Sequence, residues 1–237
     1  MSFSFHKKKI KVWLIGDSTM SIKEVKAYPE SGWGMPFAYF FDGTVEVDNR
    51  AKNGRSTRTF IEEKLWKPVA ENIKEGDYLF IQFGHNDESK EKIDRYTTPE
   101  QYIANLKLFI STARERKAIP VLLTPVSRRQ FDKEGNVRET HVIYSKLVAD
   151  VAQELKVPLI DLDTKSRELY KKMGPETSKL LFLQLEPNEH QNYPEGKNDN
   201  THFSELGARK IAQIVLAGIK DLKLELAERI RPPLPKK

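Results

Sequence analysis

The feature that most limits the possible folds is the alternation of short apolar runs with longer amphipathic stretches along the chain. Runs with apolar residues on both faces are typical of strands in a parallel sheet that helices cover on both sides. Because strands that alternate with helices need crossover connections, the pattern predicts one doubly wound α/β domain. The five candidate strands are Val12–Ile15, Val45–Val47, Tyr78–Phe83, Val121–Leu123 and Leu159–Ile160.

Three of the amphipathic stretches carry clear helix signals. Thr98-Pro99-Glu100-Gln101 combines a hydroxyl cap, a proline at the first helical position and the glutamine of a capping box. The spacing of apolar residues over 144–155 predicts a second helix. A third helix is predicted to begin at Ser204, and its expected inward side chains are Leu206, Ile211, Ile214, Val215, Ile219 and Leu222.

The length of the chain suits a single domain, because one hydrophobic core serves chains of up to roughly 250 residues. We expect one domain over residues 1–237, with its core at about residues 10–226. The segment 227–237 contains Arg231-Pro232-Pro233-Leu234-Pro235, which cannot continue a helix because proline has no amide hydrogen. We therefore predict that residues 227–237 form a proline-rich tail that runs over the surface of the domain.

Composition excludes several classes of protein. The chain has no cysteine, which excludes disulfide scaffolds, thiol nucleophiles and zinc sites with cysteine ligands. Its histidines show no spacing typical of metal ligands. The 40 Lys and Arg residues exceed the 34 Asp and Glu residues by six, but the two signs are interleaved and form no basic block. This balance argues against nucleic acid as a partner.

No segment indicates a membrane partner. The longest apolar runs fall far short of the ~18 residues that a membrane span needs. The basic start, Met1–Lys9, is followed by Gly16-Asp17-Ser18, which interrupts any apolar core of signal-peptide length. We therefore expect a soluble cytoplasmic protein, unless a leader has been removed. The sequence indicates no oligomeric state.

Four polar segments fall where functional sites of doubly wound sheets gather, beyond the carboxyl ends of the strands. Two of them follow the first and central strands, a third lies between the second strand and its helix, and the fourth precedes the last helix. In chain order they are Gly16-Asp17-Ser18-Thr19, Asn53-Gly54-Arg55-Ser56, Gly84-His85-Asn86-Asp87 and Asp199-Asn200-Thr201-His202.

These segments supply the groups that an ester hydrolase needs: a nucleophile, a base, a group that orients the base, and donors for the oxyanion. Ser18, at the mouth of a buried strand, is the candidate nucleophile, and His202 is the candidate base. Asp199, three residues earlier, can bind the other ring nitrogen of His202 and fix its tautomer. The candidate oxyanion donors are the Ser18 amide, the Gly54 amide and the Asn86 side-chain amide.

The four segments, in this order, resemble the blocks of the SGNH (GDSL) hydrolase superfamily. Gly32-Trp33-Gly34, Thr124-Pro125-Val126 and Asp199 to Ser204 further resemble the rhamnogalacturonan acetylesterase group. The resemblance implies a three-layer α/β/α sandwich around a five-stranded parallel sheet of flavodoxin-like order, with no metal or organic cofactor. It also implies the catalytic roles given above for Ser18, Asp199 and His202, and the oxyanion roles of Ser18, Gly54 and Asn86.

Structural interpretations of the same residues remain open. Ser18 could cap a helix, and Asp199 and His202 could belong to a surface turn and a helix start. Trp33 could stack on a sugar or lie in the core, and His85 could contact substrate or be a packed ring. Arg55 could bind a uronate carboxylate or belong to the solvated surface, as could Arg58, Arg128 and Arg129. As candidate substrate contacts we take Trp33, Arg55 and His85.

The sequence thus predicts a carbohydrate O-acetylesterase that acts on oligosaccharides derived from rhamnogalacturonan or pectin through a serine acyl-enzyme. Its partner is an acetylated oligosaccharide. Two alternatives stay open: a broader esterase or lipase with the same triad, acting on other acetylated sugars, aryl esters or thioesters, and a carbohydrate-binding domain without catalysis.

Overall fold

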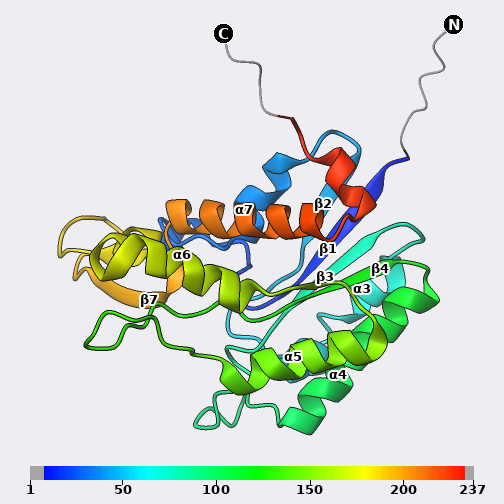
Figure 1. Cartoon of the computed structure of the whole chain (residues 1–237), viewed down its shortest axis with the longest axis horizontal. Coiled ribbons are helices and arrows are strands. Elements are labelled where there is room, and N and C mark those ends of the chain that lie inside the picture. The colour runs from blue at the N-terminus through cyan, green and yellow to red at the C-terminus, as the bar shows by residue number, and fades with distance from the viewer. Residues whose placement is uncertain (1–7, 233–237) are drawn as a thin grey trace, which may run out of the picture.

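A computed structural model describes residues 8–232 and has a five-stranded sheet at its centre (Figure 1). The strand order is β2-β1-β3-β4-β5 and every neighbouring pair is parallel. This order is the flavodoxin-like one, in which the chain reverses its direction of travel across the sheet between β1 and β3. The strands are β1 (Ile10–Gly16), β2 (Val45–Asn49), β3 (Tyr78–Gln82), β4 (Ile119–Leu123) and β5 (Leu159–Ile160). The predicted parallel sheet and all five of its strands are confirmed.

Helices cover both faces of the sheet, as Figure 1 shows for α6 and α7 on one side and α4 and α5 on the other. Alternate residues of β1 enter the two cores: Val12 and Leu14 pack with α7, and Trp13 and Ile15 pack with α4. Each face therefore has its own apolar core, which explains why β1, β3 and β4 contain few polar residues. The helices are α1 (Gly34–Phe37), α2 (Thr57–Glu62), α3 (Lys67–Asn72), α4 (Pro99–Glu115), α5 (Val142–Leu155), α6 (Leu162–Thr177) and α7 (Glu205–Asp221).

The predicted helix starts are confirmed by their caps. Thr98 accepts a hydrogen bond from the Gln101 amide and the Gln101 side chain returns one, so α4 begins with a complete capping box. Ser204 caps α7 by accepting a hydrogen bond from the Gly207 amide, without a reciprocal side-chain bond. The predicted inward positions of Leu206 and Leu222 are wrong, because both are exposed. Leu206 lies in the first turn beside the buried stripe, and Leu222 follows the last turn.

A second, antiparallel sheet of two strands was not expected from the sequence. It pairs β6 (Phe182–Leu185) with β7 (Lys197–Phe203), and Phe203 also bridges to Ser31. The fourth polar segment therefore lies on a strand of this small sheet and not in a loop. Short 3₁₀ turns complete the chain: η1 (Val25–Ala27), η2 (Ala38–Phe40), η3 (Ser178–Leu181) and η4 (Glu225–Arg229).

The start of the predicted tail packs against the domain, so the expected boundary at 227 is too early. Ile230 forms a bridge with Phe41, and the Arg231 amide donates to the Phe40 carbonyl. The prolines from residue 233 onward lie outside the described residues. Among residues 8–232, none of the helices combines the length and the apolarity that crossing a membrane would take.

Candidate active site

Residues from all four polar segments line one cleft at the carboxyl edge of the sheet. The cleft has a volume of ≈ 450 Å³. Because parallel strands end at the same edge, loops that are distant in sequence meet there. The lining residues are Ser18, Glu30, Asn53, Gly54, His85, Asn86, Ser89, Lys92, Arg95, Arg128, Thr201 and His202.

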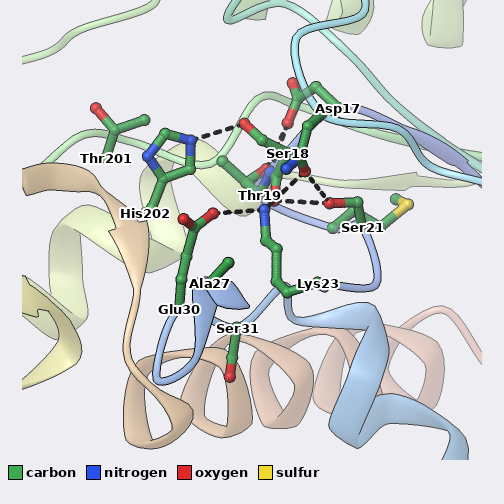
Figure 2. A network of polar contacts seen from close by, with 12 residues as sticks. Asp17, Ser18, Thr19, Ser21, Lys23, Ala27, Glu30, Ser31, Thr201 and His202 are labelled. Atoms are coloured by element: carbon green, nitrogen blue, oxygen red, sulfur yellow. Dashed lines mark hydrogen bonds and ion pairs between the residues drawn. The ribbon is translucent and has the colours of Figure 1, made fainter. Parts of the chain in front are cut away.

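Ser18, His202 and Asp199 form a continuous chain of hydrogen bonds. The Oγ atom of Ser18 lies 2.9 Å from Nε2 of His202, and Nδ1 of His202 lies 2.8 Å from Oδ2 of Asp199. Figure 2 shows the His202 ring turned toward the Ser18 hydroxyl. This is the geometry in which a histidine takes the proton of a serine while a carboxylate holds its tautomer.

The Asp199 carboxylate is held in its charged form. Burial raises its pKa, but hydrogen bonds and charge from His202, together with the amides of His202 and Thr201, outweigh this effect. The net pKa of Asp199 lies well below its ordinary value. Asp199 is therefore an acceptor across the working range of an esterase, and its two oxygens bind the ring and the backbone of the same strand.

The three residues that carry the candidate oxyanion donors, Ser18, Gly54 and Asn86, all line the cleft. Gly54 has a φ of 74°, a left-handed conformation that side chains disfavour, which turns its backbone into the loop before α2. Among the described residues, neither the Gly54 amide nor the Ser18 amide has an internal acceptor. The Nδ2 atom of Asn86 donates to the Arg55 carbonyl at 3.0 Å, which orients this amide and leaves its second hydrogen for a ligand.

Replacing Asn86 with alanine is expected to lower kcat for ester hydrolysis by about 10²–10³-fold, because one preorganised oxyanion donor is worth about 3–4 kcal/mol. Steady-state kinetics on p-nitrophenyl acetate measure this. Asn72→Ala is the matched control, since Asn72 is exposed on α3 and donates only to the Pro68 carbonyl. An Asn86→Ala protein with the kcat of the parent would remove Asn86 from the site.

Two buried carboxylates hold the loops that carry the site. Asp17 accepts from the amide and the hydroxyl of Thr19, which fixes the turn around Ser18. Asp87 accepts from the amide and the hydroxyl of Thr57, which ties the loop after β3 to the start of α2. Burial, only partly offset by the hydrogen bonds from Thr57, raises the pKa of Asp87 to about 7.

Asp87 is expected to make the stability of the fold depend on pH. Its pKa is higher in the folded chain than in the unfolded one, so the folded state binds the extra proton and loses stability as pH rises from about 4 to about 7. Asp87→Asn removes this dependence and keeps the oxygen that Thr57 binds. We expect the variant to gain stability relative to the parent over that range, by at most about 4 kcal/mol. Urea unfolding of both proteins at pH 4 and pH 8 measures the gain, and an equal difference at the two pH values would contradict it.

The prediction that Trp33 contacts substrate is wrong. Its side chain is fully buried, and its indole Nε1 donates to Oε1 of Gln82 at 2.6 Å. The ring packs edge-on against Phe37, on the face of the sheet that α7 covers. The glycine before it also serves packing, because a Cβ atom at Gly32 would lie 2.0 Å from the Ser21 carbonyl oxygen. The Gly-Trp-Gly motif thus lets this segment press against the turn after β1.

Arg55 is not among the residues that line the cleft, and its contact with substrate stays a prediction. Its guanidinium binds the Glu63 carboxylate and the Asn53 carbonyl, so these partners hold the side chain near the start of α2. Its backbone carbonyl is the part that serves the site, as the acceptor for Asn86. Of the other three arginines that the sequence suggested, Arg58, Arg128 and Arg129, only Arg128 lines the cleft, and it is paired with Glu88.

His85 lines the cleft and is also a packed ring. It is 5% exposed, and its ring meets that of His141 edge-on at 4.3 Å. Burial, followed by the electrostatic effects of His141 and Arg128, holds the pKa of His85 well below its usual range. A neutral ring here could touch a sugar; that contact stays a prediction.

The sequence did not indicate the remaining charged residues of the cleft. Lys92 and Arg95 come from the irregular segment between β3 and α4, and Glu30 comes from the turn after η1. These three residues belong to none of the motifs that the sequence analysis singled out. Within residues 8–232, no group of three or more His, Asp or Glu side chains is placed to hold a metal ion.

Comparisons with known proteins agree with this geometry. The chain is 47% identical over 224 residues to the rhamnogalacturonan acetylesterase RhgT of Bacillus subtilis, covering 94% of this chain and 95% of that protein. It is 38% identical to the probable rhamnogalacturonan acetylesterase YesY of the same organism, covering 92% and 96% of the two chains.

Solved structures share the fold. The B. subtilis protein YXIM superimposes with a TM-score of 0.78 at 23% identity, covering 92% of this chain and 58% of that one. A mutant of Axe2, an acetyl-xylooligosaccharide esterase from Geobacillus, gives a TM-score of 0.65 at 17% identity, covering 95% and 98% of the two chains. The model of the GDSL-like lipase/acylhydrolase family matches residues 14–210, which include Ser18, Asn86 and His202. The chain belongs to the GDSL-like lipase/acylhydrolase family.

Proposed function

We propose that this chain is a carbohydrate O-acetylesterase that removes acetyl groups from rhamnogalacturonan-type oligosaccharides. The observation that carries the proposal is the chain of hydrogen bonds from Ser18 through His202 to Asp199, at 2.9 and 2.8 Å, opening into a polar cleft. Two relatives support the choice of substrate, because one is named a rhamnogalacturonan acetylesterase and the other a probable one.

The reaction follows from the positions of these groups. Ser18 Oγ attacks the acetyl carbonyl carbon while its proton passes to Nε2 of His202. The carbonyl oxygen becomes an oxyanion and accepts hydrogen bonds from the amides of Ser18 and Gly54 and from the Asn86 side chain. The ester bond then breaks, and His202 returns the proton to the sugar oxygen as it leaves. The acetyl group remains on Ser18.

The second half repeats the first with water as the nucleophile. His202 takes a proton from water as its oxygen attacks the acetyl-enzyme, and the oxyanion occupies the same donors. When the intermediate collapses, the proton on His202 returns to Ser18 Oγ and acetate leaves. Asp199 stays charged throughout and stabilises the protonated ring in both halves.

The character of the cleft favours a short acyl group on a polar alcohol. None of its lining residues carries an aliphatic or large aromatic side chain, so the cleft offers no apolar wall to a fatty acyl chain. This disfavours a lipase. Three cations, those of Lys92, Arg95 and Arg128, line the cleft, and Arg128 is paired with Glu88. The one carboxylate among the lining residues, that of Glu30, is paired with Lys23. An oligosaccharide that carries uronate groups matches this charge, since arginine binds carboxylates in bidentate geometry.

The test is acetate release from acetylated rhamnogalacturonan oligosaccharides, with acetylated xylan and longer p-nitrophenyl esters measured alongside. We expect fast release from the first substrate, little from xylan, and rates on aryl esters that fall from acetyl to butyryl. Equal or faster release from xylan would discard the pectin assignment and keep the mechanism. Oligosaccharide binding without any acetate release would favour a binding domain.

A further inference from the structure

A buried lysine lies directly behind the candidate nucleophile. The Lys23 side chain is 2% exposed, and its ammonium contacts the Ser18 carbonyl at 2.5 Å, Oδ1 of Asn53 at 2.9 Å and Oε1 of Glu30 at 2.7 Å. An ammonium has three hydrogens, so these three acceptors use all of them. Figure 2 shows Lys23 reaching from below the turn after β1 toward Ser18, with Glu30 beside it.

Two of the three partners of Lys23, Ser18 and Asn53, belong to the two loops that supply backbone donors to the proposed oxyanion hole. The Ser18 carbonyl is fixed by Lys23, and this orients the residue whose amide and hydroxyl both face the acyl group. Asn53 precedes Gly54, so the Gly54 amide belongs to the peptide that follows Asn53. Ser21 Oγ also binds Oδ1 of Asn53, at 2.5 Å, which closes the link between the two loops.

Joining two loops through a buried ammonium costs free energy, because the charge is removed from water. Burying an ammonium is unfavourable unless it is paired, and apolar replacements of buried ion pairs are often as stable or more so. Glu30 provides the pairing charge, and its carboxylate lines the cleft. Stability alone therefore does not explain the buried charge of Lys23. Its contacts with the Ser18 turn and with the loop of Asn53 point to a role in positioning these two loops.

We propose that Lys23, held by Glu30, is a positioning residue for the oxyanion hole: its ammonium fixes the Ser18 turn and the Asn53-Gly54 loop at one distance from each other. This inference rests on the proposed function for the role of the two amides. It assigns to Lys23 no contact with substrate.

The first test is Lys23→Met, which keeps the length of the stem and removes the charge and its three hydrogen bonds. A displacement of about 1 Å in a catalytic group can lower the rate about 10²-fold. We expect kcat for p-nitrophenyl acetate to fall by about that factor, with KM changed less than about threefold. Lys26→Met is the matched control, because Lys26 pairs with Glu24 on the surface of the same segment.

The second test is the pH profile of Glu30→Gln. Burial lowers the pKa of the Lys23 ammonium, and the carboxylates of Glu30, Asp17 and Asp199 oppose that effect. Removing the Glu30 charge favours neutral Lys23, so we expect the alkaline loss of kcat to move to lower pH than in the parent. Glu24→Gln, on the exposed pair, is the control. Tyr193 also lies near Glu30, and Tyr193→Phe in the Glu30→Gln background should leave the shifted limb in place.

The outcomes separate this inference from the proposed function. A folded Lys23→Met protein with the parent kcat would overturn the inference. If Lys23→Met does not fold, an alkaline limb of Glu30→Gln that coincides with that of the parent overturns it instead. A parent that hydrolyses p-nitrophenyl acetate but no acetylated sugar would overturn only the proposed substrate. A parent that hydrolyses no ester would overturn both.

Discussion

Replacing Ser18 with alanine is expected to lower kcat for acetyl ester hydrolysis by about 10⁴–10⁶-fold. Without Oγ there is no atom 2.9 Å from Nε2 of His202 to attack the acyl carbon, and His202 can only activate water at a distance. The residual rate would come from the oxyanion donors and from substrate binding. Initial rates of acetate release, at substrate concentrations well above KM, measure the loss.

Ser111→Ala controls for the loss of a hydroxyl, because Ser111 lies on the exposed face of α4 and its Oγ donates only to the Leu108 carbonyl. Thermal unfolding of both variants should match that of the parent within a few degrees. Ser18 provides no helix cap in the structure, so its removal has no structural reason to unfold the chain. A Ser18→Ala protein within tenfold of the parent kcat would end the nucleophile assignment.

Asp199→Asn is expected to have the next largest effect, a loss of about 10⁴-fold in kcat. The carboxylate accepts from Nδ1 of His202 at 2.8 Å, which leaves Nε2 unprotonated and able to take the Ser18 proton. An amide in its place can donate to Nδ1, which favours the tautomer with the proton on Nε2. It also provides no negative charge to stabilise the ring when it is protonated.

The Asp199→Asn change should leave the fold intact, because the remaining oxygen can still accept from the amides of Thr201 and His202. Asp221→Asn is the matched control, since Asp221 forms only a long, exposed ion pair with Lys165 at the end of α7. Equal kcat for Asp199→Asn and Asp221→Asn, with both proteins folded, would show that Asp199 does not orient His202.

Much of the fold could be predicted because each signal is local. The strands are marked by apolar residues on both faces, and the helix caps join residues three positions apart. The small sheet of β6 and β7 was missed because most residues of β7 are polar and the pairing depends on a hairpin of irregular sequence. The exposure of Leu206 was missed because apolar spacing does not define the edge of a buried stripe.

The proposed triad and oxyanion donors could be predicted because parallel strands bring their following loops to one edge. Long side chains were less predictable, because their direction is set by partners distant in sequence. Trp33 turns inward to Gln82, and Arg55 turns to Glu63. Lys23 resembles any surface lysine in the sequence, and only the fold places Ser18, Asn53 and Glu30 around it.

The measurement that tests the central claim most directly is the capture of the acetyl-enzyme. The protein would be mixed with p-nitrophenyl acetate, whose good leaving group makes acylation fast, and quenched in acid during turnover. Mass spectrometry of the digested protein then locates the acetyl group. We predict one acetyl group on the peptide that contains Ser18, absent from Ser18→Ala and present in Ser111→Ala. Turnover with the acetyl group on another residue, or with Ser18 never acetylated, would contradict the proposed mechanism.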